Sequence, residues 1–174
     1  MGDLGDKLKQ AGDWLAKHIP GFAGYVKRED RRRADKVFRD FLVEKLKDAK
    51  ATLSSATVDI TDLGDMDALK KLARLESKYE TVTDRLRLAD YGYTGWFDTT
   101  QISFEELNKI YEFDIGLTTN VEEILTTSKD LKIANPEKIS KIIDNLNLAL
   151  DDLNEKLRAR DNMFMNEIKF NSEE

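Results

Sequence analysis

Apolar residues recur in alternating steps of three and four along four long stretches of this chain, and this spacing constrains the fold most strongly. In the stretch from about 66 to 89 the series comprises Leu69, Leu72, Leu75, Tyr79, Val82, Leu86 and Ala89. Such steps place side chains on one face of an α-helix, and they are typical of helices that pack antiparallel in a bundle. Similar series run through about 29–58 and 103–131, and from about 135 to near the C-terminus.

Residues that favour helix ends separate these stretches. Asp65 is suited to cap the helix that starts at Met66. Ser103 and Glu106 have the spacing of a capping box, and the pair at 135–136, Asn followed by Pro, fits a helix start. The segment 59–64 is expected to end the second helix.

The chain contains only two prolines, at positions 20 and 136 of 174, so most of it can be helical. We predict an all-α fold, an antiparallel up-down four-helix bundle of long helices plus an N-terminal amphipathic helix. Residues 1–18 form that amphipathic helix, 19–28 a linker, 29–170 the bundle, and 171–174 a frayed tail.

The connection at 90–98 is unusually aromatic, with four aromatic residues and two glycines between helical stretches. Antiparallel helices would bring it to the same end of the bundle as the linker and the arginine run at 31–33. This end either closes the core, with glycines allowing tight turns, or presents a surface to a partner, since Tyr, Trp and Arg are enriched at interfaces. The candidate interaction residues are Tyr25, Arg31, Arg32, Arg33, Tyr91, Tyr93, Trp96 and Phe97.

Two polar residues interrupt the apolar series. Asp114 falls on the apolar face of the fourth helix, and a buried carboxylate needs a hydrogen-bonding partner. Folding the third and fourth helices against each other places Tyr79 opposite it, so a Tyr79–Asp114 pair is predicted. Arg160 lies on the apolar face of the last helix. Its side chain could pair with Glu106 or with neighbours of Asp161 near the aromatic end, but we expect it to reach solvent at the bundle end.

No catalytic, metal or cofactor signature is recognisable. The chain has no cysteine and a single histidine, His18, which is too few for a zinc site or for the paired Glu-x-x-His motifs of dimetal bundles. A phosphate-binding glycine loop is also missing. We therefore expect no enzyme, no cofactor and no metal.

Charge is unevenly distributed along a chain whose net charge is −6. Residues 1–50 carry 13 Lys and Arg against 9 Asp and Glu, and the basic excess peaks at 27–33. A basic end can attract anionic partners, but a charge run more often faces solvent and complements acidic helices of the same protein. The acidic body argues against nucleic acid as a partner.

Three functions stay open at this point. The first is a cytoplasmic, non-catalytic interaction or scaffold protein that binds a protein partner or itself. The second is a peripheral membrane protein that uses residues 1–18 and the basic run, because Leu4, Leu8, Trp14 and Leu15 could lie on a membrane surface. The third is a small-ligand binder with its site under the aromatic connection.

Several segments also resemble a family of uncharacterised prokaryotic helical proteins. They are Ile-Pro-Gly-Phe-Ala-Gly-Tyr at 19–25, Arg-Glu-Asp-Arg-Arg at 28–32, Ala-Asp-Lys at 34–36, Ala-Asp-Tyr-Gly-Tyr-Thr-Gly-Trp-Phe-Asp at 89–98 and Tyr-Glu-Phe-Asp at 111–114. The resemblance covers residues 19 to about 160. It implies a helical fold, and it carries no activity that can be transferred.

Overall fold

The computed structural model describes residues 2–89, 94–98 and 101–171, and the side chains of 3–89, 95–98 and 101–165. Within these residues the chain forms helices and no strands, so the predicted all-α class is confirmed. The described helices are α1 (Gly2–His18), α2 (Arg28–Leu63), α3 (Met66–Leu88), α4 (Thr94–Asp98), α5 (Phe104–Asp130) and α6 (Pro136–Asn171).

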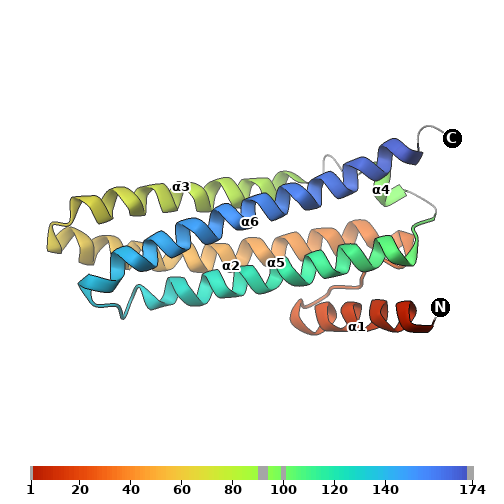
Figure 1. Ribbon diagram of the computed structural model, residues 1–174, viewed down its shortest axis with the longest axis horizontal. Coiled ribbons are helices and arrows are strands. Elements are labelled where there is room, and N and C mark those ends of the chain that lie inside the picture. Colours follow the sequence, from red (N-terminus) through yellow and green to blue (C-terminus); the bar gives the residue numbers. More distant parts are fainter. Residues whose placement is uncertain (1, 90–93, 99–100, 172–174) are drawn as a thin grey trace.

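The four long helices α2, α3, α5 and α6 lie lengthwise beside one another, and α1 lies along the outside of this group (Figure 1). Helix α2 contacts α3 and α5, while α6 contacts the same two helices from the other side. Each long helix therefore has two long neighbours, and their apolar faces share one core. Helix α1 packs on α5, and the short α4 packs on α2 and α6.

The core follows the apolar series of the sequence. Buried side chains recur along every long helix, for example Leu72, Leu75 and Leu86 of α3 and Leu146 and Leu153 of α6. Burying a side chain of this size contributes about 1.5–3 kcal/mol, so the repeated series supplies the main driving force for packing.

The predicted helix starts are confirmed. The Asp65 side chain accepts a hydrogen bond from the Ala68 backbone N–H (3.0 Å) at the start of α3. Ser103 and Glu106 form the complete capping box at the start of α5, and α6 begins at Pro136.

Two boundaries differ from the prediction. Helix α2 does not end at 59 but continues to Leu63, because Ile60 extends its buried face while its polar neighbours point to solvent. Gly64 then ends the helix with φ of 71°, a conformation that glycine adopts without strain. The connection after α3 was predicted as a loop, but its residues 94–98 form the short helix α4.

Helix α1 turns its apolar side toward the rest of the protein. Leu8 and Leu15 are buried, and Trp14 stacks on His18 with ring centroids 3.7 Å apart. The linker that follows turns at Gly21 and Gly24, whose φ angles are 82° and 86°. This linker returns the chain to the start of α2 at the end of the molecule where α4 lies (Figure 1).

Candidate functional site

A buried ion pair lies where the linker, α2, α5 and α6 meet. Asp114 of α5 accepts hydrogen bonds from Arg160 of α6, at 2.7 Å from Nε to Oδ1 and 3.2 Å from Nη2 to Oδ2. The Asp114 side chain is fully buried and Arg160 is 2% exposed. A two-point contact between a guanidinium and a carboxylate fixes both side chains and is stronger than a single hydrogen bond.

A second carboxylate, Asp35 of α2, lies on the other side of Arg160. The Nη2 atom of Arg160 is 3.0 Å from Asp35 Oδ1, which makes an ion pair without hydrogen-bond geometry. Asp35 Oδ2 accepts a hydrogen bond of 2.8 Å from Arg39, which in turn donates to the Leu86 backbone carbonyl of α3. Two arginines therefore balance two carboxylates in this cluster, so each buried charge has a partner of opposite sign. We call Asp35, Arg39, Asp114 and Arg160 the ionic cluster.

Aromatic rings enclose the guanidinium of Arg160. Its central carbon lies 4.8 Å from the ring centroid of Phe38 and 4.7 Å from that of Phe164. A cation over an aromatic face is attracted to the ring electrons, and more strongly where water is excluded. The same rings thus shield the ionic cluster from solvent and stabilise its positive charge.

Tyr25 attaches the linker to this cluster. Its hydroxyl donates to Asp114 Oδ2 at 2.6 Å and accepts from Arg160 Nη2 at 3.1 Å. Its backbone N–H donates to the Tyr111 hydroxyl at 2.8 Å, and its carbonyl accepts from Arg31 Nε at 2.9 Å. Tyr25 is fully buried, so both its side chain and its backbone fix the linker to the helices.

The environment shifts the pKa values of these groups in directions that follow from burial. Burial raises the pKa of the Asp114 carboxyl from its usual 3.8, although Arg160 acts in the opposite direction. Burial and the nearby charge of Asp114 raise the pKa of Tyr25 well above 10. Burial alone would lower the pKa of Arg160, but Asp114, Tyr25 and Asp35 raise it well above its usual value. The arginine therefore stays charged and the tyrosine stays protonated at neutral pH.

The predicted Tyr79–Asp114 pair is not formed. The Tyr79 hydroxyl is 2.7 Å from the Ser128 hydroxyl, one donating to the other, whereas Asp114 is occupied by Tyr25 and Arg160. Both residues are buried as expected, but Tyr79 meets α5 near its C-terminal end, where Ser128 lies, instead of at Asp114. The expectation that Arg160 reaches solvent is also wrong, because the ionic cluster holds it in the interior.

The aromatic candidates for a partner surface lie mostly inside the protein. Trp96 and Phe97 of α4 are 1% and 2% exposed, and Trp96 packs edge-on against Phe164, with 4.6 Å between the ring centroids. With the buried Tyr25, these rings close the core at this end of the molecule. Tyr91 and Tyr93 lie outside the described residues.

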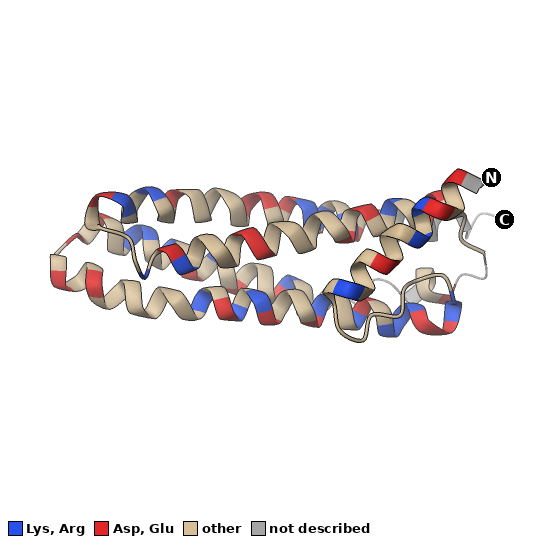
Figure 2. Cartoon of the chain, turned by 90° about the horizontal axis from the view of Figure 1, so that it is seen from below, with Lys and Arg blue, Asp and Glu red and all other residues tan. Residues whose placement is uncertain are grey.

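The arginine run divides between interior and surface. Arg31 is 3% exposed and lies over the Trp96 ring, with 5.6 Å between its central carbon and the ring centroid. Arg32 is 3.7 Å from the Asp98 carboxylate and lies over the Phe97 ring, while Arg33 is exposed. Figure 2 shows lysines, arginines and acidic residues interspersed along the helices, and within this run Arg32 has Asp98 as an acidic neighbour.

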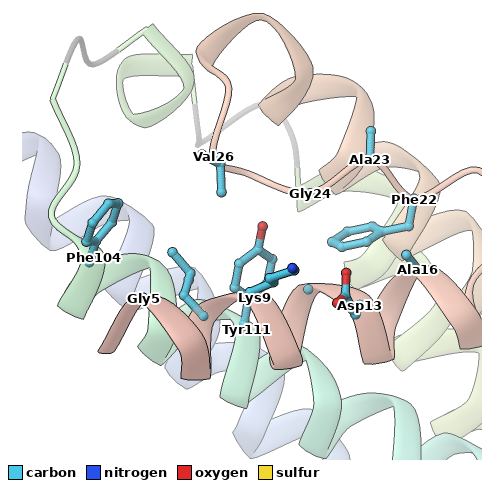
Figure 3. Close-up of a pocket in the computed structure, with 12 residues that line it drawn as sticks. Gly5, Lys9, Asp13, Ala16, Phe22, Ala23, Gly24, Val26, Phe104 and Tyr111 are labelled. Carbon is cyan, nitrogen blue, oxygen red and sulfur yellow. The ribbon is translucent and has the colours of Figure 1, made fainter. Parts of the chain in front are cut away.

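An open pocket lies next to the ionic cluster, between α1, the linker and the N-terminal part of α5. It encloses about 380 Å³, and we call it the α1 pocket. Figure 3 shows Tyr111 between Phe104 and Phe22, with Lys9 and Asp13 along the side formed by α1. Tyr111 both lines this pocket and accepts the hydrogen bond from Tyr25, so a single side chain connects the pocket to the linker's attachment. The α1 pocket was not predicted from the sequence, because α1 and the linker form it together with α5, which lies far along the chain.

Asp35 and Arg39 are the residues of the ionic cluster that the sequence analysis missed. A signal was present: Asp35 lies three residues before Phe38 and seven before Leu42, and so continues the apolar face of α2 toward its N-terminus. A charged residue at such a position indicates a buried ion pair in the same way as Asp114 does.

Among the described residues, no helix combines the length and apolar character needed to cross a membrane. The described part of the chain likewise contains no group of three or more His, Cys, Asp or Glu placed to hold a metal ion.

Comparison of this chain with protein-family models, with curated proteins and with solved structures finds no significant match.

Proposed function

We propose that this protein is a non-catalytic interaction or scaffold protein of the cytoplasm, in which α2, α3, α5 and α6 act as a rigid antiparallel up-down bundle. The observation that carries this proposal is a set of exposed apolar side chains at the end of the molecule opposite α4. Leu63 and Met66, on either side of the turn between α2 and α3, are 55% and 63% exposed, and Ile133, between α5 and α6, is 85% exposed. Figure 1 places both connections at the same end.

Such side chains contribute little to the core and leave apolar surface in water. Single exposed apolar residues are ordinary, whereas several at one site mark contact surfaces. Ile133 supports this interpretation most directly, because a branched apolar residue is uncommon in an exposed helix connection. This partner surface thus lies at the opposite end of the molecule from α4, the described part of the aromatic connection at 90–98.

The interior polar groups support the non-catalytic part of the proposal. Asp35, Asp114 and Arg160 are buried to at least 98% and engage one another and Tyr25. In this arrangement their charges pair with one another in the interior and are almost completely shielded from solvent.

A surface-variant comparison tests the proposal. The triple variant Leu63→Ser, Met66→Ser, Ile133→Ser removes the exposed apolar end, and Leu88→Ser, Leu148→Ser serves as control because these leucines are 62% and 68% exposed elsewhere. If the surface binds another protein, we expect the wild type and the control to capture that protein and the triple variant to fail to do so. If the surface binds a second copy of this chain, we expect light scattering to show self-association of the wild type and the control but not of the triple variant. Identical partners and identical mass for all three proteins would contradict the proposal.

The membrane alternative requires a conformational change. Leu8 and Leu15 of α1 are buried against the rest of the protein, so α1 would have to leave α5 before its apolar face could enter a lipid surface. Co-sedimentation of the full chain with anionic liposomes distinguishes the two functions, because the interaction proposal expects no binding.

A further inference from the structure

Two turns form the end of the molecule that carries the exposed apolar side chains. One turn joins α2 to α3 and the other joins α5 to α6, and both lie at the same end (Figure 1). Backbone hydrogen bonds fix each of them: the Gly64 N–H donates to the Thr61 carbonyl at 3.0 Å, and the Ile133 N–H donates to the Asp130 carbonyl at 3.2 Å. A surface held in this way loses little conformational freedom when a partner binds, which favours association.

The turn between α2 and α3 is acidic. Residues 59–67 contain four aspartates, all of them exposed, and no lysine or arginine. Asp62 lies in the last turn of α2, where the free carbonyl groups of the helix end already carry partial negative charge. Among the described residues, Asp59 and Asp62 make no salt bridge, whereas Asp67 pairs with Lys70 at 3.8 Å. Negative charge therefore accumulates beside the exposed apolar side chains of this turn.

The turn between α5 and α6 is basic. Residues 129–141 contain four exposed lysines, at positions 129, 132, 138 and 141, against two acidic residues, Asp130 and Glu137. Lys138 lies in the first turn of α6, where the free N–H groups of the helix end carry partial positive charge. Within the part of the chain that the structure describes, these four lysines make no salt bridge. Positive charge therefore surrounds the exposed Ile133.

The two turns complement each other when two copies of the chain meet end to end. A two-fold axis perpendicular to the long helices places the α2–α3 turn of one copy against the α5–α6 turn of the other, so the same contact occurs twice. Each contact then brings Leu63 and Met66 against Ile133 and surrounds them with aspartates that face lysines. An apolar centre with a charged rim is the usual composition of a protein interface.

We propose that this end is the contact surface of a symmetric end-to-end dimer, so that its partner is a second copy of this chain. The inference rests on the proposed function, because it names the partner of the same surface. The end of a group of four helices is small, and small interfaces bind weakly. We expect a dissociation constant on the order of 100 μM that rises with salt concentration, because the charges of the rim are exposed.

Charge reversal tests the pairing of the two turns. The basic variant reverses the acidic turn and the acidic variant reverses the basic turn. The substitutions are Asp59→Lys, Asp62→Lys and Asp67→Lys in the basic variant, and Lys129→Glu, Lys132→Glu and Lys138→Glu in the acidic variant. All six side chains are exposed, so we expect both variants to fold, which thermal unfolding verifies. Sedimentation equilibrium of the full chain at concentrations up to about 1 mM measures the association.

Each variant alone carries two turns of the same sign, so like charges would oppose each other in the dimer. We expect the association of either variant with itself to be weaker than that of the wild type by about tenfold or more. In an equimolar mixture, the basic turns of one variant face the acidic turns of the other. We expect this mixture to associate at least as strongly as the wild type, a recovery that loss of folding cannot produce.

A third variant controls for the change in net charge. Asp13→Lys, Asp48→Lys and Glu112→Lys change the net charge as much as the basic variant does, at exposed positions of α1, α2 and α5 outside the two turns. We expect this control to associate like the wild type. A control that is as monomeric as the basic variant would overturn the inference, because net charge alone would then explain the loss.

Two further outcomes overturn the inference. One is a wild type that stays monomeric up to about 1 mM, and the other is a mixture of the two reversed variants that fails to associate. The proposed function is tested separately: if the wild type is monomeric but still captures a protein that the triple serine variant does not, the surface binds a different protein and only the dimer is excluded.

Discussion

The Tyr25 hydroxyl and the Asp114 carboxylate are joined by a hydrogen bond of 2.6 Å that attaches the linker to α5. Because Asp114 is also held by Arg160, this bond connects the N-terminal segment to the charged interior of the long helices. Buried charges are seldom stabilising relative to an apolar core, but removing one partner leaves the other uncompensated. The ionic cluster therefore favours one arrangement of four segments over its alternatives.

Asp114→Asn tests this relationship. Arg160 would lose its two-point carboxylate partner inside the protein, so we expect a loss of about 3–5 kcal/mol in the free energy of unfolding measured with denaturant. Asp144→Asn is the matched control, because Asp144 is about half exposed and pairs with Lys71 on the surface, and we expect it to cost less than about 1 kcal/mol. Equal losses for the two variants would show that Asp114 is not the buried partner of Arg160.

A double-mutant cycle distinguishes the observed partner of Tyr79 from the predicted one. Tyr79→Phe leaves the Ser128 hydroxyl without its buried partner, and Ser128→Ala does the reverse, so each should cost about 1–3 kcal/mol. The stability losses of the two changes should not add up in the double variant, because the first substitution has already removed the hydrogen bond that the second would break. Tyr79→Phe and Asp114→Asn should instead be additive within about 0.5 kcal/mol. Strong coupling in the second cycle would restore the pairing predicted from the sequence.

The two linker glycines should differ in their tolerance of alanine. Both have positive φ, so alanine is strained at either position. At Gly24 a Cβ atom would also lie 2.6 Å from the Tyr111 hydroxyl, whereas at Gly21 it would meet nothing within 4 Å. We expect Gly21→Ala to cost about 1 kcal/mol and Gly24→Ala clearly more, measured by thermal unfolding. Gly116→Ala, in the exposed part of α5, should stabilise the protein by up to about 1 kcal/mol.

Stability should decline at alkaline pH. Burial raises the pKa of Tyr79 from 10 to about 12, so between pH 10 and 12 the folded protein binds more protons than the unfolded chain. The contribution of Tyr79 to stability is therefore constant below pH 10 and falls as pH rises through this window, by about 2–3 kcal/mol. The raised pKa values of Tyr25 and Tyr111 act in the same direction.

Denaturant unfolding of the wild type and Tyr79→Phe between pH 9 and 12 measures this effect, with tyrosine ionisation followed by absorbance. The variant should lose less stability over the window, because phenylalanine has no proton to release. Parallel curves for the two proteins would contradict the assigned pKa.

The local features of the fold were predictable from the sequence because they depend on residues a few positions apart. Periodicity identified the long helices, the caps at Asp65 and Ser103 and the proline at 136 indicated three starts, and the position of Asp114 on an apolar face indicated its burial. The end of α2 shows the limit of such signals, since the segment 59–64 predicts a break, whereas Ile60 continues the buried face and the helix extends to Leu63.

Only the tertiary structure decided which residues meet. Tyr25 and Asp114 are 89 positions apart, and Tyr25 and Arg160 are 135 apart, so no local spacing relates them. The relative rotation and sliding of packed helices selected Ser128 over Asp114 as the partner of Tyr79, and placed Trp96 inside the core. The sequence by itself determined that one face of each helix must be buried, because apolar side chains at helical spacing lie on one face and are removed from water when that face packs. Which polar groups share that interior depends on the three-dimensional packing of several segments at once.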